Sequence, residues 1–247
     1  MLMPKNRQLI LNSIRTNLKV FIKFSRILVL LLLVACKSDN AIKESKSETT
    51  STAAKTEQAE TSSSKKIVVF GDSLTAGYGL EDVNDAFPGI IQDKIDALQL
   101  DYTIVNSGVS GETTSGGINR IDWVLNEEPS IFILELGAND GLRGVPLQQT
   151  KENLQGIIDA VKKKYPSTKI ILAGMQLPPN MGQTYTTEFK NLFPSLSKKN
   201  DLYLIPFLLD NVGGVAALNQ SDGIHPTKEG HEILATNVWN VLKPILK

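Results

Sequence analysis

The chain has 247 residues, of which 41% are hydrophobic and 21% are charged, and its formal net charge is zero. This length suits one or at most two globular domains. The neutral balance hides an asymmetry. Six basic and no acidic residues lie before position 36, so the rest of the chain has an acidic excess of six. A mildly acidic body argues against binding to nucleic acid, which requires a basic face.

Cysteine and histidine are scarce in this sequence. Cys36 is the only cysteine, and His225 and His231 are the only histidines. A disulfide within the chain and a cysteine-rich metal site are therefore excluded, and a transition-metal site would need mostly carboxylate ligands. The glycine motifs that bind phosphates or dinucleotides are also missing. We expect neither a metal nor another cofactor.

The N-terminal segment reads as a targeting signal. Residues 27–35 are a run of nine apolar residues behind a basic segment. Such a run is too short to span a bilayer comfortably and has the length of a signal-peptide hydrophobic region. It ends in Leu33-Val34-Ala35-Cys36, which resembles the lipobox of bacterial lipoproteins. The resemblance implies a lipoprotein signal peptide over residues 1–35 and lipidation of Cys36. An uncleaved anchor with an incidental cysteine is the alternative.

Residues 36–64 predict a disordered tether behind the lipidated cysteine. From Lys37 onwards the segment consists largely of Ser, Thr, Lys, Glu and Ala, and Ile42 is its only strongly apolar side chain. It cannot bury enough apolar surface to offset the entropy lost on ordering. As a flexible chain it would span roughly 30 Å.

Residues 65–247 alternate between short apolar runs and helical patterns. The runs are continuous rather than alternating, which predicts strands that are covered on both faces. They are Ile67–Phe70, Tyr102–Asn106, Ile131–Leu136, Lys169–Ala173 and Leu202–Ile205. Helices are predicted at Ala86–Leu98, Gly116–Leu125 and Thr187–Lys198, and along the stripes from Leu147 to Val161 and from Ile233 to Ile245. This alternation predicts one α/β domain with three layers, α/β/α, around a five-stranded parallel sheet.

Candidate catalytic residues follow the predicted strands. In a parallel α/β sheet, sites form at the carboxyl ends of the strands, and Ser73 comes directly after the first one. Asp222 precedes His225 by three residues. A carboxylate at that spacing can orient the histidine ring, which can then act as the base that activates a serine. We therefore expect Ser73, His225 and Asp222 to form the catalytic centre of a hydrolase.

Four sequence blocks resemble those of the SGNH (GDSL) hydrolases. They are Gly71–Tyr78, Asn106–Glu112, Gly137–Gly144 and Asp222–Pro226, in family order across residues 65–247. The third block is similar to that of the bacterial thioesterase I, lysophospholipase and arylesterase subgroup.

The resemblance implies a flavodoxin-like SGNH hydrolase fold and a carboxylic ester hydrolase that works through a Ser-His-Asp triad and an acyl-enzyme. It also implies an oxyanion hole, with donors at the backbone N–H groups of Ser73 and Gly111 and at the side-chain amide of Asn139. Loss of one such donor typically lowers the rate roughly 100- to 1000-fold.

Each of these positions also has a purely structural interpretation. The alternatives are helix caps at Asp72 or Ser73, a turn glycine at Gly111, an Asx-turn at Asn139 or Asp140, and surface loop residues at Asp222 and His225. All of them would have to hold at four strand ends at once, which favours the catalytic interpretation. His231 is expected to be a partly exposed structural residue of the last helix, and Glu135 receives no role.

The leading hypothesis is an esterase of the cell envelope, held by lipidated Cys36 and expected at the outer membrane, that hydrolyses small-molecule esters or lysophospholipids. A carbohydrate O-acetylesterase of the same family and a catalytically silent binding module are the alternatives. The membrane is the expected partner, nucleic acid is not, and the protein is expected to be a monomer. The loop Met175–Tyr185 either walls an acyl pocket or is structural.

Overall fold

The computed structural model describes residues 64–247. The expected signal peptide, residues 1–35, and all but the last residue of the expected tether, residues 36–64, lie outside the described residues. Within the described part, no helix combines the length and the apolar character needed to cross a membrane.

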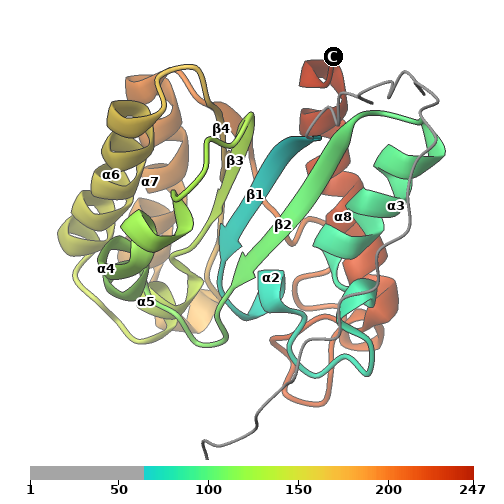
Figure 1. Ribbon diagram of the computed structural model, residues 1–247. Helices are drawn as coiled ribbons and strands as arrows, with labels where there is room; N and C mark the ends of the chain where they lie inside the picture. Colours follow the sequence, from blue (N-terminus) through green and yellow to red (C-terminus); the bar gives the residue numbers. More distant parts are fainter. Residues whose placement is uncertain (1–63) are drawn as a thin grey trace, which may run out of the picture. The chain divides into compact units, whose positions relative to one another are not determined.

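Five parallel strands form one sheet in the order β2-β1-β3-β4-β5 (Figure 1). The strands are β1 (Lys65–Gly71), β2 (Tyr102–Gly108), β3 (Ile131–Glu135), β4 (Lys169–Ala173) and β5 (Tyr203–Ile205). This is the strand order of flavodoxin-like folds, in which the winding direction reverses between β1 and β3. The predicted α/β class and the five-stranded parallel sheet are confirmed.

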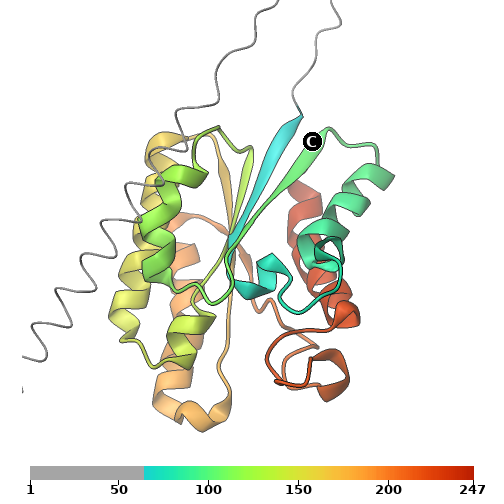
Figure 2. The ribbon, with the colours of Figure 1, turned by 60° about the horizontal axis from the view of Figure 1, so that its bottom comes forward.

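Helices cover both faces of the sheet and complete the three layers (Figures 1 and 2). One face carries α3 (Phe87–Ala97) and α8 (Lys228–Leu242), and the other carries α4 (Thr114–Val124), α6 (Leu147–Lys164) and α7 (Gln183–Asn200). Two short helices, α2 (Ser73–Ala76) and α5 (Ala138–Leu142), follow β1 and β3. Short 3₁₀ turns occupy Val83–Asp85 (η1), Pro179–Met181 (η2), Ala216–Leu218 (η3) and Lys243–Ile245 (η4).

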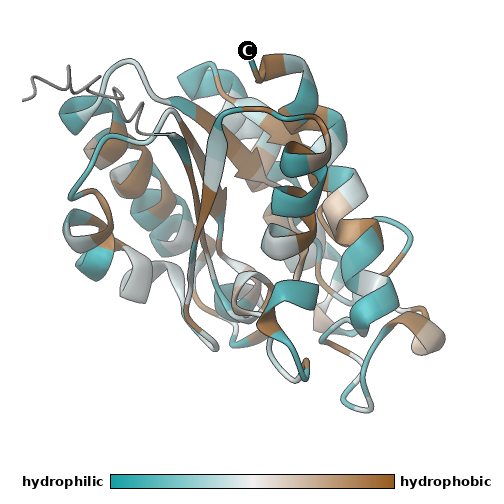
Figure 3. Cartoon of the chain, turned by 45° about the vertical axis from the view of Figure 1, so that its right-hand side comes forward, coloured by the Kyte–Doolittle hydropathy of each residue, from teal (hydrophilic) through white to brown (hydrophobic). Residues whose placement is uncertain are grey.

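The apolar runs are buried because helices cover the sheet from both sides. All five residues of β3 are buried, and so are the last five residues of β1. Four of the five residues of the predicted stripe on α6 are completely buried, namely Leu154, Ile157, Ile158 and Val161, and Leu147 at its start is half-buried. Figure 3 shows hydrophobic residues along the strands, with hydrophilic residues on the outer sides of the helices. Burial of one such aliphatic side chain contributes roughly 1.5–3 kcal/mol.

Helix boundaries differ from the predicted ones where a local signal outweighs the apolar stripe. Helix α4 begins at Thr114 and not at Gly116, because the Thr113 hydroxyl accepts the N–H of Gly116 at 3.4 Å and caps the first turn. Helix α7 begins at Gln183, directly after Gly182, whose positive φ of 88° ends the η2 turn.

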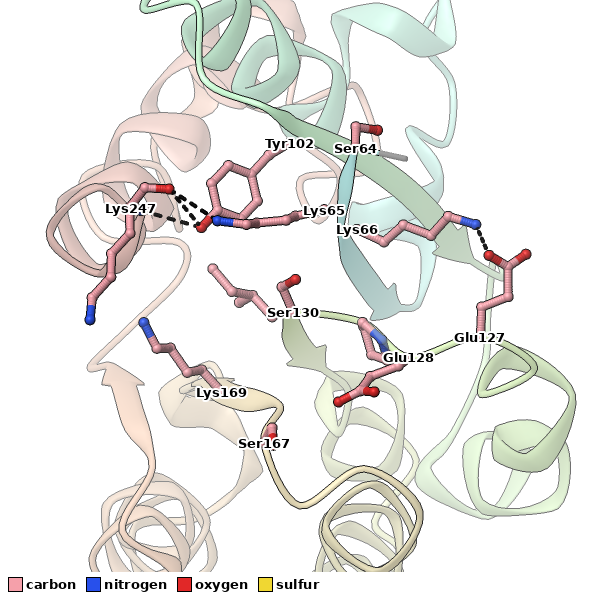
Figure 4. Close-up of a pocket in the computed structure, with 12 residues that line it drawn as sticks. Ser64, Lys65, Lys66, Tyr102, Glu127, Glu128, Ser130, Ser167, Lys169 and Lys247 are labelled. Atoms are coloured by element: carbon pink, nitrogen blue, oxygen red, sulfur yellow. Dashed lines mark hydrogen bonds and ion pairs between the residues drawn. The ribbon is translucent and has the colours of Figure 1, made fainter. Parts of the chain in front are cut away.

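A cavity of about 620 Å³ lies at the amino ends of the strands (Figure 4). Lys65 and Lys169 begin β1 and β4 there, and Lys66 forms an ion pair with Glu127. The four sequence blocks lie at the carboxyl ends of the strands, so this cavity is at the opposite edge of the sheet from the candidate catalytic residues.

Candidate active site

The carboxyl ends of three strands meet at one edge of the sheet. In the parallel register, Gly71 at the end of β1 pairs with Gly108 of β2 and with Glu135 of β3. The segments that follow these strands therefore start side by side, at the point where the winding direction reverses. Ligands of doubly wound sheets bind at such a reversal.

Ser73 is the first residue of α2, and the residue before it forms the cap. The Asp72 carboxylate accepts the N–H of Leu74 at 3.1 Å through Oδ1, and Gly77, with φ 75°, ends the helix after one turn. The helix cap that was the structural alternative at this junction is therefore present, and Asp72 forms it. Because Asp72 caps the turn, the Ser73 hydroxyl is left for another partner.

Ser73, His225 and Asp222 form one hydrogen-bonded line. Ser73 Oγ lies 2.9 Å from His225 Nε2, and His225 Nδ1 lies 2.6 Å from Asp222 Oδ2. Two segments that are 152 residues apart in the sequence thus meet at hydrogen-bonding distance. The side chains of His225 and Asp222 are 20% and 39% exposed, so a substrate can approach from solvent.

The electrostatics of Asp222 fix the roles of the two histidine nitrogens. Its carboxylate accepts the backbone N–H of His225 at 3.0 Å, the His225 ring, and the N–H of Ile224 at 2.9 Å. These hydrogen bonds, first that from the His225 backbone, lower the pKa of Asp222 to about 2. An ionised carboxylate only accepts, so Nδ1 must carry the ring proton and Nε2 is free to take the serine proton. Tyr78 packs on this ring, with centroids 4.5 Å apart.

Asn139 and Gly111 reach the same edge from α5 and from the loop after β2. Asn139 Nδ2 donates to Asp72 Oδ2 at 2.9 Å, so its amide lies beside the Ser73 turn. The Arg143 guanidinium donates to the Gly111 carbonyl at 3.0 Å and to Asn139 Oδ1 at 3.4 Å. A Cβ at Gly111 would have room, with its nearest neighbour 3.7 Å away, but φ is 77°. Glycine is therefore required here by the left-handed backbone.

The model of the GDSL-like Lipase/Acylhydrolase family matches residues 69–233, which is more than half of the chain. The chain belongs to the GDSL-like lipase/acylhydrolase family. The resemblance read from the four sequence blocks is thus confirmed, and the protein is a carboxylic ester hydrolase.

Relatives of this GDSL hydrolase match 73% of its chain. Esterase TesA of Pseudomonas aeruginosa is 39% identical over 181 residues, which are 73% of this chain and 89% of that protein. Thioesterase 1/protease 1/lysophospholipase L1 of Escherichia coli is 34% identical over 181 residues, 73% of this chain and 84% of that protein. The crystal structure of the esterase EstA from Pseudoalteromonas sp., inhibited by monoethylphosphonate, has a TM-score of 0.69 at 32% identity and covers 73% of this chain and 97% of that chain.

Glu135 of this GDSL hydrolase was missed by the sequence reasoning, and it lies directly under the Ser73 turn. It is completely buried, and its Oε2 accepts the backbone N–H of Asp72 at 3.1 Å and the hydroxyl of Thr75 at 2.7 Å. Its Oε1 has no hydrogen-bond partner within residues 64–247. A Cβ at Gly71 would lie 2.3 Å from Oε2, so glycine leaves the space that this carboxyl fills. The available signal was a lone acidic residue at the end of an apolar strand.

Burial sets the charge of Glu135. Desolvation, followed by the nearby charge of Asp72, raises the pKa of Glu135 well above its usual value of 4.5. The folded protein therefore keeps this proton above pH 4.5, whereas the unfolded chain releases it. Since the unfolded state then binds fewer protons, the free energy of unfolding falls as pH rises above 4.5.

We predict that Glu135→Gln removes this pH dependence. Glutamine keeps an oxygen that can accept from Asp72 and Thr75, but it cannot titrate. The variant minus wild-type difference in unfolding free energy should therefore grow above pH 4.5, by up to about 1.4 kcal/mol per pH unit. Urea unfolding of both proteins from pH 4 to 8 measures the difference. Parallel profiles would mean that Glu135 is ionised in the folded protein.

His231 is structural, as expected, but the expectation that it is partly exposed was wrong. It is 1% exposed, and its Nδ1 accepts the N–H of Phe87 at 3.2 Å. Burial, and to a smaller extent the charge of His225, lowers the pKa of His231 to about 4. The apolar stripe of α8 did not predict the burial of His231. Ile233 and Leu234 define an apolar face next to His231, but the sequence does not show that α3 covers this residue.

Proposed function

We propose that this GDSL hydrolase cleaves carboxylic esters through a Ser73-His225-Asp222 triad and an acyl-enzyme. The observation that carries the proposal is the line from Ser73 Oγ through His225 to the Asp222 carboxylate, with contacts of 2.9 and 2.6 Å. A nucleophile, a base and an orienting acid at these distances are what activation of a serine requires.

In the first half of the reaction, Ser73 Oγ attacks the carbonyl carbon of the ester and its proton passes to His225 Nε2. The ionised Asp222 stabilises the resulting imidazolium. The negative charge on the carbonyl oxygen is met by the N–H groups of Ser73 and Gly111 and by the Asn139 amide. When the carbonyl re-forms, the alcohol departs with the proton from Nε2 and the acyl group stays on Ser73.

In the second half, water attacks the acyl-enzyme and gives its proton to His225 Nε2. The new oxyanion is held by the same donors. As the carbonyl re-forms, the bond to Ser73 Oγ breaks, Oγ regains the proton from Nε2, and the carboxylic acid leaves. The inhibited structure of Pseudoalteromonas EstA supports this route, since a phosphonate is a tetrahedral mimic that activated serines take up.

The relatives favour aryl esters, thioesters and lysophospholipids as substrate classes. An arylesterase from Vibrio mimicus is 33% identical over 178 residues, and the Escherichia coli relative is named for thioesterase and lysophospholipase activities. An envelope location argues against acyl-CoA, which belongs to the cytoplasm. We therefore propose an arylesterase and lysophospholipase of the cell envelope.

Hydrolysis of p-nitrophenyl esters from acetate to palmitate, together with a lysophospholipid, tests the proposal. Labelling by a fluorophosphonate probe should accompany turnover and should be blocked by prior incubation with ester. Activity confined to acetate and acetylated glycans would favour a carbohydrate O-acetylesterase. A folded protein that neither turns over esters nor takes up the probe would be a binding module.

We also propose that the esterase is anchored in the envelope through Cys36, on the strength of the lipobox-like Leu33–Cys36 and the polar segment behind it. One acyl chain holds a protein only marginally, whereas several together anchor it stably. We predict that the wild type partitions with membranes and that Cys36→Ser does not, while Ser38→Ala, two residues away, behaves as the wild type. Fractionation with mass spectrometry of the N-terminus measures this. A soluble mature wild type without lipid would contradict the anchor.

A further inference from the structure

The Asn139 side chain can stabilise the oxyanion only when its NH₂ group, and not its oxygen, faces the substrate. Its oxygen and its NH₂ group have nearly the same shape, so only hydrogen-bond partners decide which of them faces the oxyanion. If the oxygen faced the substrate, it would repel the developing negative charge. The orientation of this amide therefore decides whether Asn139 stabilises the oxyanion or repels it.

Asp72 provides a partner that can bind only one end of this amide. Its Oδ2 accepts from Asn139 Nδ2 at 2.9 Å, and a carboxylate oxygen cannot donate in return. On the other side, the Arg143 guanidinium donates to Asn139 Oδ1 at 3.4 Å. These two contacts fix the amide and leave the second N–H of Asn139 Nδ2 for the substrate.

Asp72 is itself buried and is held by two further hydrogen bonds. It is 1% exposed, its Oδ1 accepts the N–H of Leu74 at 3.1 Å, and its own backbone N–H donates to Glu135 Oε2 at 3.1 Å. Glu135 also accepts the hydroxyl of Thr75 at 2.7 Å. The turn that carries Ser73 and the carboxylate that holds Asn139 thus share one buried anchor.

The charges of the two acids suit these roles. Burial raises the pKa of Asp72 to about 6, although the N–H of Leu74, the Asn139 amide and the charge of His225 oppose the rise. At pH 7 Asp72 is therefore mainly ionised, and the raised pKa of Glu135 favours the protonated form of that acid. An ionised Asp72 can accept the hydrogen bonds from Leu74 and Asn139. A protonated Glu135 avoids a second buried charge next to it.

We propose that Asp72 is a positioning residue that turns the Asn139 amide so that its second N–H points at the oxyanion, with Glu135 as the buried anchor of Asp72. This inference rests on the proposed role of Asn139 as an oxyanion donor. Asp72 itself does not touch the ester and acts through Asn139.

Asp72→Asn is the variant that separates capping from positioning. The asparagine oxygen can still accept the N–H of Leu74, but the NH₂ group then faces the NH₂ of Asn139. Two donors cannot pair, so the Asn139 amide is expected to turn its oxygen toward the oxyanion. We expect kcat for p-nitrophenyl butyrate to fall about 100-fold with little change in KM, as for loss of one oxyanion donor.

A double-mutant cycle tests whether the effect passes through Asn139. Asn139→Ala should lower kcat by a similar factor, and Asp72→Asn added to it should lower kcat by less than about threefold more, because coupled positions are not additive. Asp82→Asn is the matched control, since Asp82 caps η1 by accepting the N–H of Asn84 at 2.9 Å. This control should keep the wild-type kcat.

The outcomes distinguish the positioning role from the proposed function. If the two losses multiply in the double variant, the positioning role is wrong and the oxyanion role of Asn139 stands. If Asn139→Ala leaves kcat unchanged, the oxyanion role of Asn139 is wrong, and so is the positioning role of Asp72 that rests on it. The loss of the attraction between Asp72 and the His225 imidazolium would also lower kcat, but it would multiply with Asn139→Ala.

A measurement on the unmutated esterase covers the case in which Asp72→Asn does not fold. In ¹⁵N-labelled protein, one side-chain N–H of Asn139 should be protected from exchange by Asp72. The other should shift downfield when Ser73 carries a phosphonate. Rapid exchange of both protons, or no shift in the adduct, would overturn the proposal.

Discussion

Ser73→Ala is expected to lower kcat for p-nitrophenyl esters by about a million-fold, the size of loss seen when the nucleophile of a serine hydrolase is removed. The fold should be unaffected, because the α2 turn is capped by Asp72 and the Ser73 hydroxyl contacts His225. Thermal unfolding should therefore occur close to the wild-type temperature. The variant should also lose fluorophosphonate labelling.

The matched control for this variant is Ser115→Ala, on the exposed side of α4. It removes the same hydroxyl from a helix next to the site and should leave kcat unchanged. A Ser73→Ala enzyme that retains a tenth of the wild-type activity would mean that another group attacks the ester.

The sheet was predictable because each strand is short, apolar and buried on both faces. Ile131–Leu134 and Ile170–Ala173 are uninterrupted apolar runs, and Glu135 is the one polar residue within the predicted strand Ile131–Leu136. Both runs are strands almost at the predicted bounds. Helix caps were harder to predict, because the Thr113 cap of α4 depends on a single hydrogen bond that apolar periodicity does not encode.

The site was predictable only in part. Asp222 and His225 are three residues apart, so their contact follows from local geometry. The contact of Ser73 with His225 depends on the order of the strands and on the return of the chain before α8, which local pattern does not contain. The contacts of Asp72 and Glu135 were not predicted either. The local sequence does not show whether an acidic residue at the end of a strand is buried or exposed to solvent.

Three carboxyl groups near Ser73 illustrate how environment assigns function. Asp222 is partly exposed and accepts several hydrogen bonds, which lower its pKa to about 2. Asp72 is buried, and its pKa is raised to about 6. Glu135 is completely buried, and desolvation followed by the charge of Asp72 raises the pKa of Glu135 well above 4.5. Asp222 is therefore ionised beside His225, Asp72 is mainly ionised at pH 7 beside the Asn139 amide, and burial favours the protonated form of Glu135 beneath the turn.

The two histidines provide the second large test, since they are matched in type and differ in environment. His225→Ala is expected to lower kcat by about a million-fold, as does loss of the base in a serine hydrolase, with little change in stability because the ring is near the surface. His231→Ala should keep the activity of each folded molecule and lower stability. It leaves the N–H of Phe87 buried without an acceptor, which costs about 1–3 kcal/mol.

The pH dependence of stability gives His231 a second signature. Its pKa is lowered from 6.5 to about 4 in the folded protein, so its stabilising contribution is complete above pH 6.5 and is lost as pH falls through 4. In His231→Ala this loss disappears, and the gap in unfolding free energy between wild type and variant should narrow toward pH 4. Kinetics and urea unfolding of both variants measure the contrast. If His231→Ala proved inactive while folded, and His225→Ala stayed active, the assignment of the base would have to be exchanged between them.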